Sequence, residues 1–227
     1  MQRGIPILGL VGGIGSGKSA LADWLAQRLR VVVLDADASG HAALRQPEVQ
    51  FAIRRDFGDD VFNPTGDVER SRLAQRVFGD TPALQTARQQ LEAIVHPVIR
   101  RDLEQQIAEL RERQACDVIV LDAAVMLESG WSELCDAIAF VDVPRSERLA
   151  RVLATRGWPE SELNRREASQ WPLDRKRAAA DIVIDNSSDL ESAGLVLAKF
   201  LRSRFPQLNA ESVLMFAATT AVAAAIL

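Results

Sequence analysis

Lysine is scarce in this 227-residue sequence, and its scarcity argues against one class of nucleotide-binding protein. Of 27 basic residues only Lys18, Lys176 and Lys199 are lysines, which leaves 24 arginines. None of the three lysines belongs to an Asn-Lys-x-Asp segment, so a GTP-binding switch protein is not expected. A basic excess is also missing, because the formal net charge is -4. Since binding to nucleic acid needs many basic side chains for the phosphates, we expect no nucleic-acid partner.

Cysteine and long hydrophobic runs are sparse as well. Cys116 and Cys135 are the only cysteines, and their spacing suits neither a metal site nor a disulfide framework. We expect reduced, buried thiols in a cytoplasmic protein that is a monomer or a weak oligomer. The apolar C-terminal tail, residues 209–227, includes an uncharged run of 16 residues, Ser212–Leu227. A bilayer needs roughly 20 residues, so a buried helix or a disordered tail is favoured over a membrane anchor, and the choice stays open.

Short apolar runs divide the chain at intervals and predict buried strands. They are Ile5–Val11, Val31–Leu34, Val118–Leu121, Ala137–Val141 and Ile182–Ile184. Continuous rather than alternating apolar runs are typical of a parallel sheet covered on both faces, and helical patterns separate these runs. We therefore predict an α/β fold with a five-stranded parallel sheet and right-handed crossovers.

The first predicted strand leads into a glycine-rich segment, Gly12–Ser19, that matches G-x-x-x-x-G-K-[ST] in full. Glycines let successive backbone N–H groups converge on phosphate oxygens, beside the positive end of the following helix. Lys18 would reach the β- and γ-phosphates, and Ser19 would place its hydroxyl on Mg²⁺. The sequence therefore predicts a nucleoside triphosphate site. Its expected residues in this segment are Gly13, Gly15, Ser16, Gly17, Lys18, Ser19 and Ala20.

Acidic residues follow two of the predicted strands. Asp35 and Asp37 come at the end of the second run, and Asp122 ends the third. Ligands of parallel α/β sheets bind at the carboxyl ends of the strands, so we expect these carboxylates near the phosphate loop. We expect only one of Asp35 and Asp37 to face the reacting centre, where it would accept the proton of the acceptor hydroxyl. Helix capping by either residue is the alternative. Asp122 would bind Mg²⁺ together with Ser19, whereas Glu128 is interpreted as a surface or capping residue.

Two helical excursions interrupt the strands. Residues 40–115 are too long for one crossover and are predicted to form a substrate-binding subdomain. Residues 145–177 contain nine basic and five acidic residues, a local charge of +4 in a chain of -4. This excess predicts a lid that closes over polyphosphate, with solvated helix faces as the alternative. The nucleotide-binding core would then comprise 1–39, 116–144 and 178–208.

Single residues of the lid are predicted to differ in role. Arg156 precedes a Gly-Trp-Pro turn, from which its guanidinium would reach the transferred phosphate. Arg148 and Arg151 are interpreted as part of a solvated helix face. Asn186, at the end of the fifth run, would meet the adenine.

The helical insertion contains His96-Pro97 within a long helical pattern. Pro97 is expected to break or start a helix, which would fix the neighbourhood of His96. An isolated histidine such as His96 or His41 is more often a structural residue than a ligand.

Taken in order, these segments resemble the dephospho-coenzyme A kinase family. The shared segments are Gly9–Ser19, Asp35–Asp37, Arg70, Leu91–Pro97, Asp122–Glu128, Arg166–Lys176 and Ala180–Asn186. They extend over roughly residues 5–187, about four fifths of the chain. The phosphate loop alone is common to many kinases, whereas its combination with Asp-Ala-Asp, His-Pro and the final Ala-Asp…Asp-Asn is specific.

The resemblance implies a three-layer P-loop kinase fold and transfer of the γ-phosphoryl group of ATP to the ribose 3′-hydroxyl of dephospho-CoA, with Mg²⁺. This is the last step of coenzyme A biosynthesis. Asp37 matches the position regarded as the catalytic base, and Arg156 and Lys176 match basic lid positions. Arg70 and His96 fall in the helical part that accommodates the acceptor. The resemblance thus assigns catalysis to Asp37, Lys18 and Arg156, and substrate binding to Asp37, Arg70, His96 and Lys176.

The sequence departs from the family pattern in three places. Ala124 stands where members commonly have Pro, which predicts a less rigid loop. Ala20 replaces the usual Thr and removes a hydroxyl near the α-phosphate, and the tail is not part of the pattern. Another small-molecule kinase acting on a nucleotide or a sugar-like alcohol remains the alternative, and the tail alone suggests a membrane-attached protein with a degenerate ATPase domain.

Overall fold

The computed structural model describes residues 4–79, 81–206 and 208, and these form two compact units. The helical unit is Ala36–Gln106. The core unit contains the described residues before Ala36 and after Gln106. The helical unit therefore begins and ends earlier than the predicted subdomain of residues 40–115.

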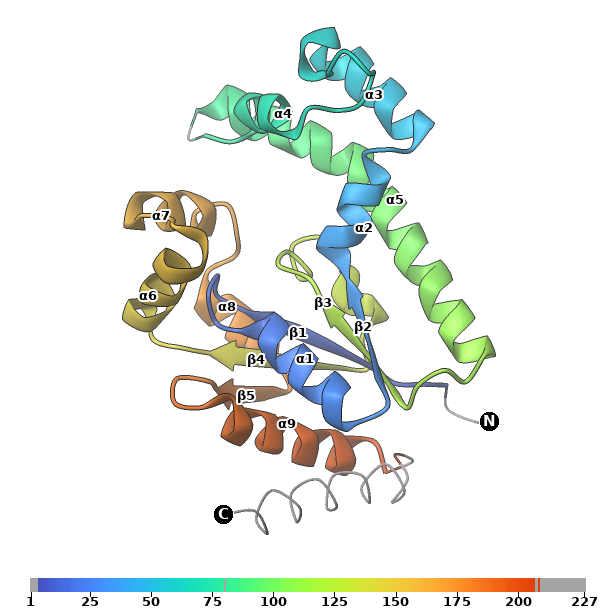
Figure 1. Cartoon of the computed structure of the whole chain (residues 1–227), viewed down its shortest axis with the longest axis vertical. Coiled ribbons are helices and arrows are strands. Elements are labelled where there is room, and N and C mark those ends of the chain that lie inside the picture. Colours follow the sequence, from blue (N-terminus) through green and yellow to red (C-terminus); the bar gives the residue numbers. More distant parts are fainter. Residues whose placement is uncertain (1–3, 80, 207, 209–227) are drawn as a thin grey trace. The chain divides into compact units, whose positions relative to one another are not determined.

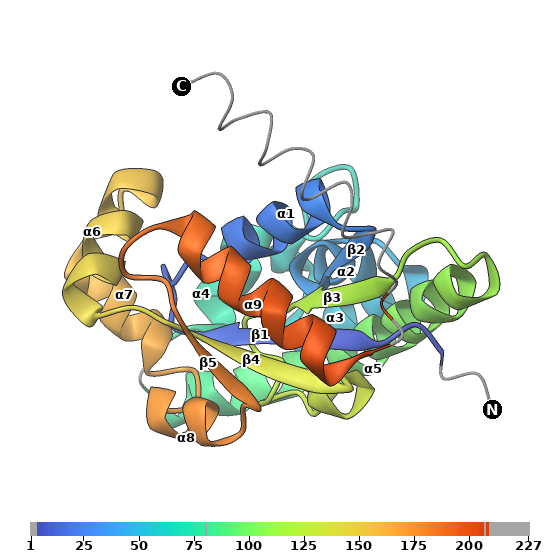
Figure 2. The same ribbon diagram turned by 90° about the horizontal axis from the view of Figure 1, so that it is seen from below.

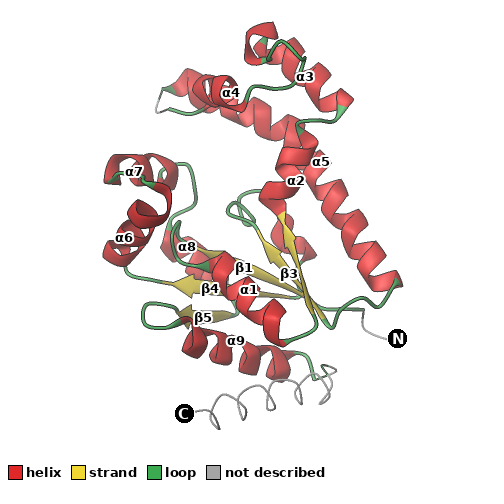
Figure 3. Cartoon of the chain, in the orientation of Figure 1, coloured by secondary structure: helices red, strands yellow, loops and turns green. Residues whose placement is uncertain are grey.

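A five-stranded parallel sheet forms the centre of the core unit, in the order β2-β3-β1-β4-β5 (Figures 1 and 3). The strands are β1 (Ile7–Gly12), β2 (Val31–Asp35), β3 (Val118–Asp122), β4 (Ala137–Asp142) and β5 (Ile182–Asp185). Each coincides with a predicted run to within two residues at either end. The predicted α/β fold with a five-stranded parallel sheet is confirmed.

Helices cover both faces of this sheet, which gives three layers (Figure 2). The helices of the core unit are α1 (Lys18–Arg28), α6 (Arg145–Arg156), α7 (Glu160–Glu167), α8 (Leu173–Ala178) and α9 (Leu190–Arg204), with the 3₁₀ turn η2 (Trp131–Leu134). On one face α1 and α9 pack together over Leu8 and Leu10 of β1. On the other face, a Cβ atom at Gly9 would lie only 2.6 Å from Met126 Cε, so the methionine side chain packs directly against the glycine backbone.

The helical unit consists of α2 (Ala36–Ala43), α3 (Pro47–Phe57), η1 (Asp59–Val61), α4 (Arg70–Val77) and most of α5 (Pro82–Glu112). Apolar residues at helical spacing supply its own core. Val49 and Ile53 are buried one turn apart on α3, and Leu73 and Val77 are buried one turn apart on α4. This spacing explains why both segments form helices although charged residues fill their other faces.

The expectation that Pro97 breaks or starts a helix is wrong, because α5 continues through it from Pro82 to Glu112. An interior proline removes one backbone hydrogen bond and costs about 3 kcal/mol. Val98, Ile99 and Leu103 follow on α5 and are buried. Burial of such side chains contributes about 1.5–3 kcal/mol each, which is enough to offset the proline.

Both cysteines are free thiols. Cys116 is buried as expected, and Cys135 is half-buried between Met126 and the η2 turn. Burial, with the Asp136 carboxylate adding to it, raises the pKa of the Cys135 thiol to about 12. Among the described helices, none is both long and apolar enough to cross a membrane. The apolar tail predicted over 209–227 lies outside the described residues.

Candidate active site

The phosphate loop joins β1 to α1 and depends on glycines for its backbone shape. Gly15 has φ = 80° and Gly17 has φ = 85°, in the left-handed region that other residues rarely adopt. Gly17 is also the N-cap of α1, so the loop ends at the positive end of that helix. Gly17, which the motif requires, is therefore also required by the backbone, and so is Gly15, which stands at a variable position of the motif.

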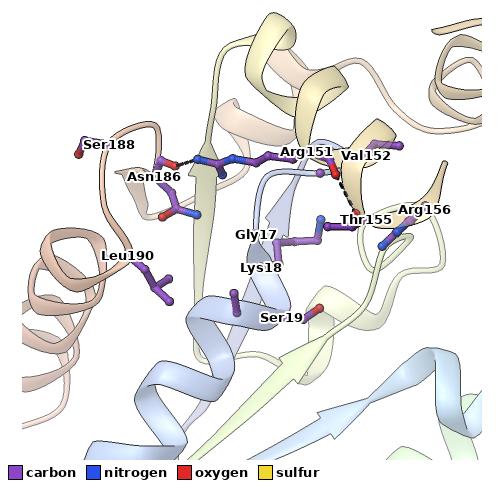
Figure 4. A pocket seen from close by; sticks show the side chains of 12 residues that line it. Gly17, Lys18, Ser19, Arg151, Val152, Thr155, Arg156, Asn186, Ser188 and Leu190 are labelled. Carbon is purple, nitrogen blue, oxygen red and sulfur yellow. Dashed lines mark hydrogen bonds between the residues drawn. The ribbon is translucent and has the colours of Figure 1, made fainter. Parts of the chain in front are cut away.

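A cavity of about 550 Å³ opens beside this loop (Figure 4). It is lined by Gly15, Gly17, Lys18, Ser19 and Ala20 of the loop and α1, by Arg151, Val152, Thr155 and Arg156 of α6, and by Asn186, Ser188 and Leu190 after β5. A volume of this size is in the range of small-molecule and cofactor sites. Gly13 and Ser16, the other two predicted loop residues, are buried beneath the loop surface.

Lys18 lies folded over the phosphate loop. Its Nζ atom donates to the carbonyl oxygens of Gly12 at 3.2 Å and Gly13 at 3.1 Å. Both acceptors are neutral, and phosphate oxygens are stronger acceptors for an ammonium group. Lys18 can therefore exchange these carbonyls for the phosphates of a bound nucleotide without moving far along the loop.

Ser19 and Asp122 meet as the sequence predicted, although they lie on different elements. The Ser19 hydroxyl at the start of α1 donates to Asp122 Oδ2 at the end of β3, at 2.5 Å. A hydroxyl and a carboxylate oxygen are the kinds of ligand that Mg²⁺ takes from a protein when substrate phosphates and water supply the rest. This pair therefore fits a magnesium ion.

Arg148 is not solvated, so the interpretation of it as part of an exposed helix face is wrong. Its side chain is 3% exposed. Nη1 donates to the Ile14 carbonyl of the phosphate loop at 3.2 Å, and Nε donates to the Val143 carbonyl at 3.2 Å. Nη1 also pairs with Glu167 of α7. A signal was present in the sequence: Val152, one helical turn later, is apolar and shares the inner face of α6.

Asn186 also holds the loop. Its side-chain Nδ2 donates to the Ser16 carbonyl at 2.8 Å, and the residue is only 5% exposed. Arg151 Nη2 in turn donates to the Asn186 carbonyl at 2.8 Å (Figure 4), so Arg151 is not merely solvated either. Asn186, which was expected to meet the adenine, thus donates its amide nitrogen to the phosphate loop, and the adenine contact stays a prediction.

Lys176 is buried, with 1% of its side chain exposed, and its ammonium has three acceptors. Nζ lies 3.1 Å from the Ala124 carbonyl, 3.0 Å from Gln170 Oε1 and 2.9 Å from Glu128 Oε1. Glu128 also accepts from the Trp171 backbone N–H at 2.8 Å, so its interpretation as a surface or capping residue is wrong. Lys176 therefore anchors the loop after β3 at Ala124, and its substrate contact stays a prediction.

Arg156 lies at the rim of the cavity, at the end of α6 (Figure 4). Its guanidinium lies 4.9 Å from the centre of the Trp158 ring, and Arg166 stacks on the same ring at 3.9 Å. Other arginines of residues 145–177, the predicted lid, pair with carboxylates of the same segment: Arg145 with Glu160, Arg151 with Glu147, and Arg165 with Glu162. Within the described part of the chain, Arg156 has no such ion pair.

The remaining predicted residues belong to the helical unit. Asp37 is exposed in the first turn of α2, directly after β2, and Arg70 is exposed at the start of α4. His96 is half-buried within α5. Burial lowers the pKa of His96, and the Glu92 carboxylate opposes this effect in part. Their roles stay predictions.

A phosphate loop joins β1 to α1, and helices cover both faces of the parallel sheet. These two features place the chain among the P-loop kinases. A family model described as dephospho-CoA kinase matches residues 6–192, and the chain belongs to this family. The dephospho-CoA kinase of Geobacter sulfurreducens is 37% identical over 201 residues, which cover 88% of this chain and 99% of that protein. The corresponding enzyme of Aromatoleum aromaticum is 40% identical over 188 residues, 82% of this chain and 87% of its own length.

Solved structures agree in fold. The Thermus thermophilus protein TT1252 superposes with a TM-score of 0.74 at 32% identity and covers 88% of this chain and 98% of its own. A dephospho-CoA kinase from Campylobacter jejuni has a TM-score of 0.54 at 16% identity, and the match covers 87% of this chain and 96% of that one. At that identity the second comparison supports the fold alone.

Proposed function

We propose that this protein transfers the γ-phosphoryl group of ATP to the 3′-hydroxyl of the ribose of dephospho-CoA, yielding coenzyme A and ADP. The observation that carries the proposal is a complete phosphate loop, with Lys18 and the Ser19–Asp122 pair, in a chain that matches the dephospho-CoA kinase family over residues 6–192. The nucleotide binds in the cavity beside the loop, which α6 and the segment after β5 complete.

The reaction forms a bond between the ribose oxygen and the γ-phosphorus and breaks the bond from that phosphorus to the β–γ bridging oxygen. Asp37 accepts the proton of the ribose hydroxyl. Lys18 and Arg156 stabilise the negative charge of the phosphoryl group during transfer, when it is greatest. Gly13, Gly15, Ser16, Gly17, Ser19, Ala20 and Asn186 complete the nucleotide site. Arg70, His96 and Lys176 bind the acceptor, with Asp37.

Ser19 and Asp122 would hold Mg²⁺, and the ion would supply charge neutralisation at the β- and γ-phosphates. The closeness of their oxygen atoms supports this assignment. The small-molecule substrates and the two free thiols are consistent with a cytoplasmic enzyme.

The test is incubation of the purified protein with ATP, Mg²⁺ and dephospho-CoA, with detection of coenzyme A and ADP. A nucleoside monophosphate and a sugar alcohol serve as competing acceptors. Lys18→Ala should abolish product formation, whereas Lys199→Ala, an exposed lysine on α9, should leave it unchanged. Faster phosphorylation of one of the competing acceptors would replace dephospho-CoA in the proposal and leave the kinase chemistry intact.

A further inference from the structure

Convergence of backbone N–H groups on a phosphate has a structural consequence for the rest of the loop. When successive N–H groups turn inward, the carbonyl oxygens of the same peptide units turn outward. Those oxygens need hydrogen-bond donors wherever protein covers them, because buried backbone acceptors are almost always paired. The residues that donate to them determine whether the loop keeps its phosphate-binding shape.

Two buried side chains perform this task, one from α6 and one from the segment after β5. Arg148 of α6 donates to the Ile14 carbonyl at 3.2 Å. Asn186, after β5, donates to the Ser16 carbonyl at 2.8 Å. Arg148 is 3% exposed and Asn186 is 5% exposed, so water does not replace either donor easily.

The closeness of these side chains also explains two of the loop's glycines. A Cβ atom at Gly13 would lie 2.7 Å from Arg148 Nη1, and one at Gly17 would lie 2.6 Å from Asn186 Nδ2. Both distances are too short for real contacts. The two donors occupy the space that a side chain at position 13 or 17 would need. Glycine at these positions therefore lets Arg148 and Asn186 approach the loop backbone.

Each donor is itself fixed by a further contact in the same unit. Arg148 pairs with Glu167 of α7, and its Nε donates to the Val143 carbonyl after β4. Asn186 is held through its own carbonyl by Arg151 of α6. Helices α6 and α7 are therefore connected to the phosphate loop through two short chains of hydrogen bonds.

We propose that Arg148 and Asn186 are positioning residues for phosphate binding: they hold the outward carbonyls of Ile14 and Ser16 so that the loop N–H groups stay convergent. This inference rests on the proposed function only in taking the loop ligand to be ATP. It assigns Asn186 to the phosphate loop rather than to the adenine, and it makes Arg148 the connection between the loop and the lid helices.

The experiment compares nucleotide affinity in variants that remove the donors. Asn186→Asp keeps the size of the side chain but turns an oxygen toward the Ser16 carbonyl, and Arg148→Met keeps length without any donor. Dissociation constants for ATP, ADP and adenosine are measured by titration calorimetry, and folding is checked by urea unfolding. We expect ATP and ADP affinity to fall by about tenfold or more, equivalent to about 1.4 kcal/mol, with adenosine affinity unchanged.

Matched controls are Asn164→Asp and Arg165→Met, both exposed on α7, which should leave all three affinities unchanged. In steady-state assays the KM for ATP should rise while the KM for dephospho-CoA stays constant. A purely structural role would instead lower the amount of active enzyme without changing either KM. If Asn186→Asp or Arg148→Met does not fold, Asn186→Ser and Arg148→Lys, which keep one donor group each, should show smaller losses of the same kind.

Two results would overturn the proposal. One is that the folded Asn186→Asp and Arg148→Met variants bind ATP as tightly as the unsubstituted protein does. The other is an equal weakening of adenosine and ATP, which would assign Asn186 to the base. Because ATP binding is measured without an acceptor, a protein that binds ATP but does not phosphorylate dephospho-CoA would refute the proposed function and leave this inference standing.

Discussion

Single charged residues acquire their roles here from the partners that surround them. Lys18 and Lys176 are both lysines in a chain that has three, yet one lies at a cavity and the other is buried. Lys18 donates to the carbonyl oxygens of Gly12 and Gly13, which a phosphate can replace. Lys176 pairs with a carboxylate as well, so its ammonium is less able to leave. The two residues should therefore respond differently to substitution.

Asp37→Asn tests the catalytic base at the scale of one functional group. The carboxamide keeps the shape of the side chain but cannot accept the ribose proton, so the turnover number should fall by roughly 10²-fold or more. ATP affinity should change little. Single-turnover rates and ATP titrations measure the two effects. Asp35→Asn, at the exposed end of β2, is the control and should be milder; the opposite order of severity would show that Asp35 is the base.

At the scale of elements, the charged side chains of residues 145–177, the predicted lid, are largely paired with one another. Carboxylates of α6 and α7 pair with Arg145, Arg148, Arg151, Arg165 and Arg166. These five arginines are therefore engaged with carboxylates of their own segment. Arg156, stacked on Trp158 at the cavity rim, is the arginine of α6 best placed to act on phosphate.

Arg156→Ala should lower kcat and kcat/KM together with little change in the dissociation constant of ATP. Positive charge aimed at the transferred phosphoryl group acts mainly on the transition state. Single-turnover rates with parallel ATP titrations check this. Arg165→Ala on α7, an exposed arginine paired with Glu162, is the matched control and should have no effect. Equal effects of the two substitutions would mean that the lid has no specific phosphate arginine.

Lys176→Met should destabilise the fold by about 3–5 kcal/mol, because it leaves the Glu128 carboxylate without its partner in a nearly buried place. Glu128→Gln should be destabilising too, and the double variant should recover part of the loss. Urea unfolding of the three proteins forms a double-mutant cycle. Lys199→Met, on the exposed face of α9, is the control. Additive losses would show that the two residues do not act as a pair.

At the scale of the whole molecule, the chain forms two units with separate tasks and separate cores. The core unit supplies the sheet, the phosphate loop and the cavity. The helical unit carries Asp37, Arg70 and His96, three of the four residues proposed for the acceptor. Its stability is therefore relevant to activity even though it contributes nothing to the phosphate loop.

His96 should make global stability depend on pH. Burial lowers its pKa below the ordinary value of 6.5, so the unfolded chain binds a proton at a higher pH than the folded protein does. The free energy of unfolding should therefore fall as the pH drops below about 6.5 toward the lowered folded-state pKa. Urea unfolding between about pH 7.5 and about pH 5 should show a smaller fall for His96→Gln than for the parent.

Local patterns in the sequence determined the sheet, the phosphate loop and the family of this protein. The five apolar runs became the five strands, because a strand buried on both faces is recognised from its own residues. The unusual backbone angles at Gly15 and Gly17 could be expected from the sequence, because they are a local property of the loop itself. The meeting of Ser19 with Asp122 followed from the rule that parallel strands end at one edge.

Only the tertiary structure decided which charged and polar residues are buried. Arg148 and Lys176 are polar in sequence, and each is buried because a distant carboxylate and distant carbonyl oxygens satisfy its donors. Pro97 remains inside α5 because buried neighbours offset its missing hydrogen bond. Burial of a charge is favourable only when its partners are in place, and those partners come from segments that no local pattern connects.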